Sequence, residues 1–400
     1  MGQRIAIIGA GPAGLMAAEV LSQYAYEVQV FEQKPSAARK FLMAGKTGLN
    51  ISHAEDIEQF VQRYDQVDWL APWVRQFDAV WIQQWMQDLG IASYVGTSGR
   101  IFPKEMKAAP LLRAWLARLN QSGVKFHYRH QVLDLTDKTL TVLDQKTAQQ
   151  RSETFDAVIL ACGAVSWSQL GSDGAWQKWF QPDDIQNFQP SNAGVERSWS
   201  QFMQPIFGQP LKRVAAWVDA SPASMGDIVI THYGLESGLI YKWGRALRQQ
   251  QRDGQTLQFT LDLLPDVSVA ELAHKLSASK KQSMSNVWRK AGLDAAKANL
   301  VREIVPKALW SQPQQLAEQI KHLQLSFTGF RPIEEAISCA GGMKRELFDA
   351  TLGLKQQPGV FACGEMLDWD APTGGYLLTA CFATGRIAGI GAHQYLKSSA

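Results

Sequence analysis

The residues with the clearest chemical meaning form a glycine-rich turn close to the N-terminus. The sequence reads G-A-G-P-A-G at positions 9–14, after a short apolar run and before a helical pattern that reaches residue 24. In such a turn the first glycine permits a tight bend, the second lets the backbone approach a pyrophosphate, and the third lets helix and strand pack closely. The free N–H groups at the start of the helix then bind the diphosphate. We therefore predict dinucleotide binding by Gly9, Gly11, Pro12, Ala13 and Gly14.

A carboxylate follows at the distance that a dinucleotide site needs. Glu32 ends the second apolar stretch about twenty residues after the turn, where an acidic side chain takes the ribose hydroxyls. We assign Gln33, Lys34, Lys40 and Val132 to the same cofactor site. The alternative is a glycine-rich structural turn with an incidental glutamate.

Three later stretches favour FAD over NAD as the bound dinucleotide. Residues 161–163 follow an apolar strand and resemble the turn that closes the FAD-side sheet of flavoproteins with two dinucleotide folds. Residues 359–365 resemble the late strand whose acid reaches the flavin ribityl or phosphate region. Residues 374–376 open a helix whose N-terminal amides would stabilise the negative charge of a reduced flavin. The expected contacts are Ala161, Cys162, Gly163, Gly364, Glu365, Asp368, Gly374, Gly375 and Tyr376.

No second G-x-G-x-x-G pattern occurs in the chain, so a dedicated nicotinamide domain is not expected. The flavin would be reduced by NADH or NADPH that docks transiently, by another protein, or by a substrate. Candidate catalytic residues are Lys46 and Asn50, which could touch the flavin, and His232, which could donate a proton to the reduced product or hold the substrate. The structural alternatives are a solvated loop for the first two and a hydrogen-bonded loop histidine for the third.

Composition excludes several classes of protein. The 400 residues carry a net charge of +3, with 46% hydrophobic residues, which is a globular composition and gives no overall argument for nucleic acid or membrane. The four cysteines lie far apart without a C-x-x-C pair, which argues against a disulfide scaffold, a metal site or a redox dithiol. No apolar run approaches the length of a membrane span, and no signal segment precedes the first strand. We expect a cytoplasmic enzyme without a metal.

The hydrophobic periodicity predicts an α/β fold with an insertion. We expect a Rossmann-like FAD-binding domain over 1–190 and 339–400, a β-rich inserted domain over 191–267 that returns at 311–338, and a basic helical subdomain over 268–310. Local patterns predict one helix through Trp73, Phe77, Trp81 and Trp85. They also predict an antiparallel meander over 124–143 and a strand over 239–243.

Residues 270–310 hold eight lysines and arginines against three acids, more net charge than the whole chain. Such helices are usually a solvated basic face, but they could also neutralise RNA phosphates. The basic residues are Lys275, Lys280, Lys281, Arg289, Lys290, Lys297, Arg302 and Lys307. Trp243 and Trp288, which lie among basic residues, are candidates for base stacking.

Over nearly its full length the chain resembles the YhiN-like, or BaiN/RdsA-type, flavoproteins. The likeness is most specific in G-E-M-L-D at 364–368 and T-G-G-Y at 373–376, and it extends to R-K-F-L-M-A-G at 39–45, N-I-S-H at 50–53, G-R-I-F-P at 99–103, T-H-Y-G at 231–234 and A-G-G at 340–342. It implies an FAD domain of the two-dinucleotide-fold type, split by a β-barrel-like insertion with a helical subdomain. It also implies reduction of a carbon–carbon double bond, in a bile-acid dienone or in a uridine of ribosomal RNA.

Two departures mark a divergent branch with its own substrate. Relatives carry arginine and cysteine where this chain has Gly48 and Leu49, and the loop over 231–239 lacks their proline. Two other functions stay open on the sequence. One is an FAD-dependent oxidase or dehydrogenase of a small amine or hydroxy compound, and the other is a flavin-bound, non-catalytic RNA-associated factor.

Overall fold

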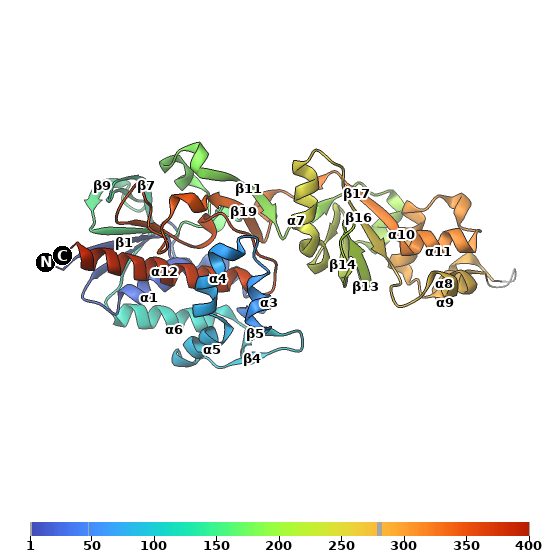
Figure 1. Ribbon diagram of the computed structural model, residues 1–400, viewed down its shortest axis with the longest axis horizontal. Helices are drawn as coiled ribbons and strands as arrows, with labels where there is room; N and C mark the ends of the chain where they lie inside the picture. The colour runs from blue at the N-terminus through green and yellow to red at the C-terminus, as the bar shows by residue number, and fades with distance from the viewer. Residues whose placement is uncertain (1, 47, 278–281, 400) are drawn as a thin grey trace. The chain divides into compact units, whose positions relative to one another are not determined.

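The computed structural model describes residues 2–46, 48–277 and 282–399. The chain forms two compact units, of which the first comprises residues 1–189 and 339–400 and the second comprises residues 190–338. Figure 1 shows the elements of both units. The second unit is a single insertion between β11 (Ile185–Ser191) and β19 (Ser338–Met343), two strands that pair with each other.

The first unit is organised by a five-stranded parallel sheet in the order β20-β10-β1-β2-β6. Its strands are β1 (Arg4–Ile8), β2 (Glu27–Glu32), β6 (Lys125–Tyr128), β10 (Ala157–Leu160) and β20 (Val360–Ala362). Ile5 lies opposite Val28 on one side and Ala157 on the other. Residues 5–8 of β1 and all four residues of β10 are apolar and buried, as is typical of the central strands of a parallel sheet. The carboxyl ends of β1, β2, β10 and β20 therefore meet at one edge.

Helices and smaller sheets complete this unit. The helices are α1 (Pro12–Leu21), α2 (Arg39–Ala44), α3 (Ile57–Val61), α4 (Val67–Gln76), α5 (Ala79–Asp88), α6 (Ala108–Gln121) and α12 (Tyr376–Ser398). The antiparallel strands are β3 (Ser52–His53), β4 (Ser93–Val95), β5 (Arg100–Pro103), β7 (His130–Thr136), β8 (Thr139–Asp144) and β9 (Gln149–Thr154). In Figure 1, α12 runs beside α1. Gly385 makes this approach possible, because a Cβ there would lie 2.2 Å from the carbonyl oxygen of Ala13.

The second unit is built on a seven-stranded antiparallel sheet in the order β17-β16-β13-β14-β15-β12-β18. Its strands are β12 (Val195–Glu196), β13 (Pro210–Trp217), β14 (Ser224–Thr231), β15 (Gly234–Glu236), β16 (Leu257–Asp262), β17 (Leu323–Phe327) and β18 (Gly329–Phe330). Its helices are α7 (Gly238–Arg252), α8 (Val269–Leu276), α9 (Met284–Ala291), α10 (Ala295–Ile304) and α11 (Pro313–Lys321). Leu257, Phe259 and Leu261 point into the core, as their alternation with polar residues predicts.

The predicted fold class is confirmed, whereas three local predictions are wrong. The tryptophan-rich stretch forms two helices, because the carboxylate of Asp78 accepts a hydrogen bond from the backbone N–H of Trp81 and starts α5 there. Residues 239–243 lie in α7, whose buried Leu239, Ile240 and Leu247 follow a helical period. Residues 125–128 pair in parallel with β2, and β9 completes the antiparallel sheet in their place.

No helix within the described residues is long and apolar enough to cross a membrane.

A buried carboxylate joins four helices of the first unit. Glu19 on α1, which is 8% exposed, accepts hydrogen bonds from Trp85 Nε1 at 3.1 and 3.2 Å and from Arg118 Nη2 at 2.8 Å. Arg386 on α12 lies 4.6 Å over the ring of Trp81 and is attracted electrostatically by Glu19, while burial lowers its pKa. The carboxylate of Glu19 on α1 therefore interacts with side chains from three other helices, α5, α6 and α12.

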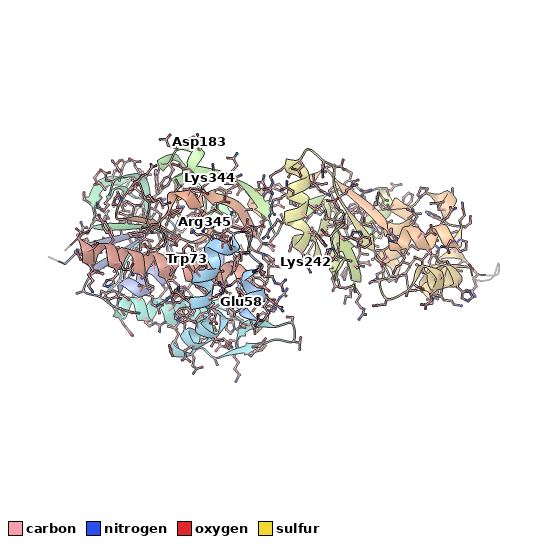
Figure 2. All side chains as sticks on the ribbon, in the orientation of Figure 1. Glu58, Trp73, Asp183, Lys242, Lys344 and Arg345 are labelled. Carbon is pink, nitrogen blue, oxygen red and sulfur yellow. The ribbon has the colours of Figure 1, made fainter. Side chains whose placement is uncertain are left out.

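We expect Glu19→Ala to lower the free energy of unfolding by about 3 kcal/mol, because it leaves Arg118 and the indole N–H without a buried partner. Urea denaturation of the purified protein measures this change. Glu58→Ala is the control, because Glu58 lies on the surface (Figure 2). It pairs there with Arg75, and an exposed ion pair adds little to stability. Equal losses from the two substitutions would contradict the role given to the buried cluster.

Candidate functional site

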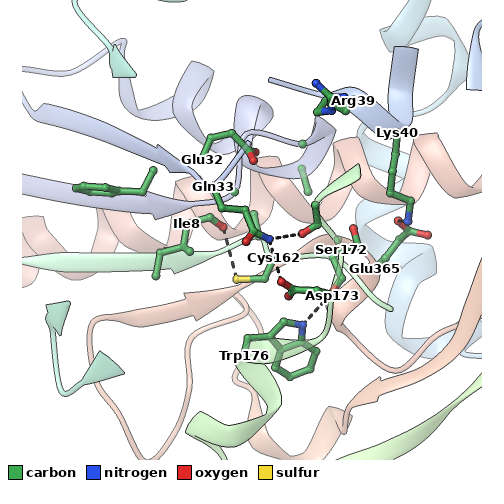
Figure 3. Close-up of a pocket in the computed structure, with 18 of the residues that line it drawn as sticks. Ile8, Glu32, Gln33, Arg39, Lys40, Cys162, Ser172, Asp173, Trp176 and Glu365 are labelled. Atoms are coloured by element: carbon green, nitrogen blue, oxygen red, sulfur yellow. Dashed lines mark hydrogen bonds and ion pairs between the residues drawn. The ribbon is translucent and has the colours of Figure 1, made fainter. Parts of the chain in front are cut away.

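A cavity opens at the carboxyl edge of the parallel sheet. It is formed by the turn after β1, the ends of β2, β10 and β20, and α2 (Figure 3). Many of the residues predicted to bind the cofactor line it. They are Gly9, Gly11, Pro12, Ala13, Glu32, Gln33, Lys40, Val132, Ala161, Cys162, Gly163, Gly364 and Glu365.

The glycine turn has the geometry that close backbone approach requires. Gly9 has a φ of +104°, and a Cβ there would lie 2.3 Å from the carbonyl oxygen of Ala161. A Cβ on Gly14 would lie 2.1 Å from the carbonyl oxygen of Gly9. Gly11 differs, since its Cβ would meet no atom within 4 Å. It precedes α1 without a side-chain cap, and Pro12 occupies the first turn, so the helix start faces the cavity with free N–H groups.

Glu32 is fixed by the backbone at the end of β2. Its two carboxylate oxygens accept hydrogen bonds from the N–H groups of Ala10 at 3.0 Å and Lys34 at 2.8 Å. Burial raises the pKa of Glu32, and these two hydrogen bonds act in the opposite direction. Each oxygen has a further lone pair, so the carboxylate can also accept from ribose hydroxyls.

Opposite charges meet at another wall of the cavity. Lys40 Nζ lies 3.1 Å from Glu365 Oε2 and donates to Ser166 Oγ at 3.2 Å. Glu365 Oε1 and Arg39 Nε are buried without a hydrogen-bond partner within the described residues (Figure 3). Buried polar atoms are nearly always paired, so an acceptor and a donor without partners fit a polar molecule bound here. The residues present therefore fit a dinucleotide with an anionic diphosphate.

Sequence reasoning missed one wall of the cavity. Gln33 Nε2 donates to the carbonyl oxygen of Gly171 at 2.7 Å and to Asp173 Oδ2 at 3.3 Å, and Trp176 Nε1 donates to the carbonyl oxygen of Gly163 at 2.9 Å (Figure 3). The turn residues of the sequence G-S-D-G at 171–174 were the available signal. Further lining residues outside the predicted set are Arg39, His130, Gln131, Ser172, Trp179 and Cys381.

Other predicted residues lie outside the lining of this cavity. Gly14 is buried in α1, Lys34 is half-buried after β2, and Lys46 is exposed after α2. Asn50 is half-buried, and its Oδ1 atom is buried without a hydrogen-bond partner within the described residues. Asp368 follows the turn that contains Glu365, and residues 374–376 lead into α12.

His232 belongs to the second unit. It is exposed in the turn between β14 and β15, with its ring edge-on to Tyr233 at 5.0 Å. Its role as a proton donor stays a prediction.

The cysteines at the cavity pack as small apolar residues. Cys162 Sγ donates to the carbonyl oxygen of Ile8 at 3.7 Å, and Cys363 Sγ donates to that of Leu160 at 3.6 Å. Burial raises the pKa of both thiols, so neither is a thiolate at neutral pH. The described residues contain no group of three or more His, Cys, Asp or Glu side chains that could hold a metal ion.

The parallel sheet, the glycine turn at a helix start and the cavity at the carboxyl edge define the Rossmann class of dinucleotide-binding proteins. Solved flavoenzymes share the fold of the whole chain. A flavocytochrome c3 fumarate reductase matches 98% of this chain and 78% of its own with a TM-score of 0.52 and 14% identity. A 3-ketosteroid-delta4-(5alpha)-dehydrogenase from Rhodococcus jostii RHA1 matches 98% of this chain and 97% of its own with a TM-score of 0.50 and 12% identity. The chain therefore has the fold of these oxidoreductases, with a Rossmann-type dinucleotide-binding domain.

The model of the HI0933-like protein Rossmann domain matches residues 3–391, so the chain belongs to this family. A 3-dehydro-bile acid delta(4,6)-reductase from Clostridium scindens is 24% identical over 96% of this chain and 98% of its own. A ribosomal RNA dihydrouridine synthase from Escherichia coli is 22% identical over 92% of this chain and 93% of its own. These relatives confirm the resemblance that the sequence motifs indicated.

We expect Gly11→Ala to fold normally but to bind FAD at least tenfold more weakly, because the new methyl group meets no protein atom and enters the space where a diphosphate would approach. Fluorescence titration of the apoprotein with FAD measures the affinity, and thermal unfolding checks the fold. Gly238→Ala is the control, since a Cβ at Gly238 also meets no atom within 4 Å and lies in the second unit. Unchanged FAD affinity in the Gly11 variant would place the diphosphate elsewhere.

Proposed function

We propose that this protein uses FAD to reduce a carbon–carbon double bond, with NADH or NADPH as a transient reductant. The observation that carries this proposal is the cavity at the sheet edge, where a buried oxygen of Glu365 has no partner among the described residues. It is supported by the similarity, over 96% of this chain, to a 3-dehydro-bile acid delta(4,6)-reductase. All four cysteines are free, which supports a reaction in the reducing cytoplasm.

Different residues of the cavity would bind different parts of the cofactor. The N–H groups at the start of α1 would bind the diphosphate, and Glu32 would accept hydrogen bonds from the ribose hydroxyls. Lys40 and Glu365 would hold the neighbouring polar groups of the cofactor, with Arg39 as a further donor. FAD, when bound, supplies hydride transfer to and from its ring. The protein then has to orient the substrate, exclude water and supply one proton, for which His232 is the candidate.

The protein should bind FAD in one-to-one stoichiometry and oxidise NADH or NADPH in the presence of a 3-oxo-Δ4,6 bile acid, the probe that the similarity to the reductase suggests. Anaerobic absorbance spectroscopy follows the nicotinamide, the flavin and the dienone together. Rapid reduction of the flavin by a small amine or hydroxy compound, with peroxide formed in air, would instead support an oxidase or dehydrogenase. Absence of flavin binding would exclude both functions.

A uridine of ribosomal RNA is the second candidate substrate, because the chain is also similar to a ribosomal RNA dihydrouridine synthase over 92% of its length. The helices expected to bind RNA offer a smaller basic surface than the sequence suggested. Lys275 pairs with Glu271 at 2.8 Å, Lys297 is buried, and Arg302 packs over the ring of Trp288 at 5.0 Å. Arg289, Lys290 and Lys307 are exposed, while Lys280 and Lys281 lie outside the described residues.

Base stacking on Trp288 is not available in this structure, since its side chain is 1% exposed in the core of the second unit. Trp243 is partly buried and packs against the same core. Any RNA contact through these helices would therefore rest on phosphates and the exposed cations.

If RNA is the substrate, cells without the gene should lose dihydrouridine at one position of the ribosomal RNA, as measured by mass spectrometry of nuclease digests. Reversing the charge of Arg289, Lys290 and Lys307 should prevent rescue by the returned gene while leaving the flavin content unchanged. The matched control reverses Arg113, Lys146 and Lys355, three exposed bases of the first unit. An unchanged dihydrouridine content would exclude ribosomal RNA as the substrate and leave a small molecule as the candidate.

A further inference from the structure

Residues 171–176 form one wall of the cavity, which we call the 171–176 wall. Its lining residues are Gly171, Ser172, Asp173, Ala175 and Trp176. The wall lies against the turn after β10, since a Cβ at Gly163 would lie 2.6 Å from Ser172 Oγ. Ser172 and Trp176 are buried, whereas Asp173 is exposed. The wall therefore reaches from the protein interior to the solvent.

Gln33 and Trp176 attach this wall to neighbouring strand ends. Gln33, the residue after β2, donates from Nε2 to the carbonyl oxygen of Gly171 at 2.7 Å and to Asp173 Oδ2 at 3.3 Å (Figure 3). Trp176 Nε1 donates to the carbonyl oxygen of Gly163 at 2.9 Å. The wall is thus joined to β2 by one side chain and to the turn after β10 by another.

The amide nitrogen of Gln33 is committed to contacts within the protein. An amide NH₂ group has two protons, and Gly171 and Asp173 provide one acceptor for each. Asp173 is itself oriented, because its Oδ1 accepts a hydrogen bond from the backbone N–H of Ala175 at 3.0 Å. The NH₂ group of Gln33 therefore holds the wall and is not available to donate to a bound molecule.

The 171–176 wall borders the part of the cavity that we assign to the ribose. Gln33 directly follows Glu32, and a Cβ at Gly171 would lie 3.8 Å from Glu32 Oε1. Further along the chain, Trp179 lines the cavity together with Val132. Aromatic and apolar side chains of this kind suit the flat ring of a purine. The wall and the residues that follow it thus fit the adenosine half of FAD.

We propose that Gln33 is a positioning residue that holds the 171–176 wall against the adenosine half of FAD and thereby sets the rate at which the cofactor leaves. The inference rests on the proposed FAD site. The end of β2 and the 171–176 wall both border the cavity, and Gln33 joins them. Moving these walls apart breaks both hydrogen bonds of the Gln33 amide. A neutral hydrogen bond adds only modestly to stability, so losing the two should speed release without abolishing binding.

The test is the dissociation rate of FAD, measured by loading the protein with radiolabelled FAD and chasing with an excess of unlabelled FAD. Gln33→Met, which keeps the length of the side chain without its donors, should raise this rate about tenfold and leave the association rate unchanged. Gln33→Glu should raise it further, because a carboxylate would then face the Gly171 carbonyl oxygen and the Asp173 carboxylate. Trp176→Phe, which removes the other attachment, should raise it as well.

Two further measurements separate a positioning role from direct contact with the cofactor. Hydrogen exchange of the apoprotein, followed by mass spectrometry, should be faster at residues 171–179 in Gln33→Met and unchanged in α5, because the wall loses its attachment before any cofactor binds. ADP, which lacks the flavin half, should compete with FAD for the site. Its affinity should fall in Gln33→Met by the same factor as that of FAD.

Gln84 provides the matched control. Its Nε2 donates to Asp88 Oδ1 at 2.8 Å on the exposed face of α5, and neither residue belongs to the lining of the cavity. Gln84→Met should leave the dissociation rate of FAD and the exchange of the wall unchanged. An unchanged dissociation rate in Gln33→Met, or a faster one without faster exchange in the wall, would overturn this inference and leave the proposed function intact. Failure of the unmodified protein to bind FAD would overturn both.

Discussion

The first unit depends on close contact between backbone segments that have no side chain between them. The turn after β1 touches the end of β10 at Gly9, the start of α1 touches that turn at Gly14, and α12 touches α1 at Gly385. A single Cβ at any of these positions would lie within 2.3 Å of a carbonyl oxygen. These contacts bring a helix start, two strand ends and a second helix to one edge of the sheet, and the cavity lies there.

Charge is distributed around this framework in pairs that are buried to different degrees. Glu19 joins helices away from the cavity, Lys40 and Glu365 face each other across its wall, and Glu55 fixes the start of α12 through Tyr376. Removing water from a charge is costly unless an opposite charge or hydrogen-bond donors replace it. Glu365 Oε1 has no hydrogen-bond partner among the described residues, and it marks a wall of the cavity that is suited to a ligand.

The second unit shows why a segment rich in lysine and arginine need not present a basic surface. Among the described residues of its helices, one lysine pairs with a glutamate, another is buried, and an arginine covers the indole of Trp288. Lysine and arginine side chains commonly pack their apolar stems against apolar neighbours in this way. The net charge of a segment therefore overestimates the positive charge that is exposed to a nucleic acid.

The sequence by itself determined the α/β class, the glycine turn and the carboxylate at the end of β2, because these features depend on backbone conformation and on residues close together in the chain. It did not determine where the tryptophan-rich helix breaks or that residues 239–243 are helical, since short apolar runs fit a strand or a helix equally well. Only the tertiary structure brought Gln33 to Asp173 and Glu55 to Tyr376. Those partners are separated by 140 and 321 positions, and no local pattern encodes contacts at such separations.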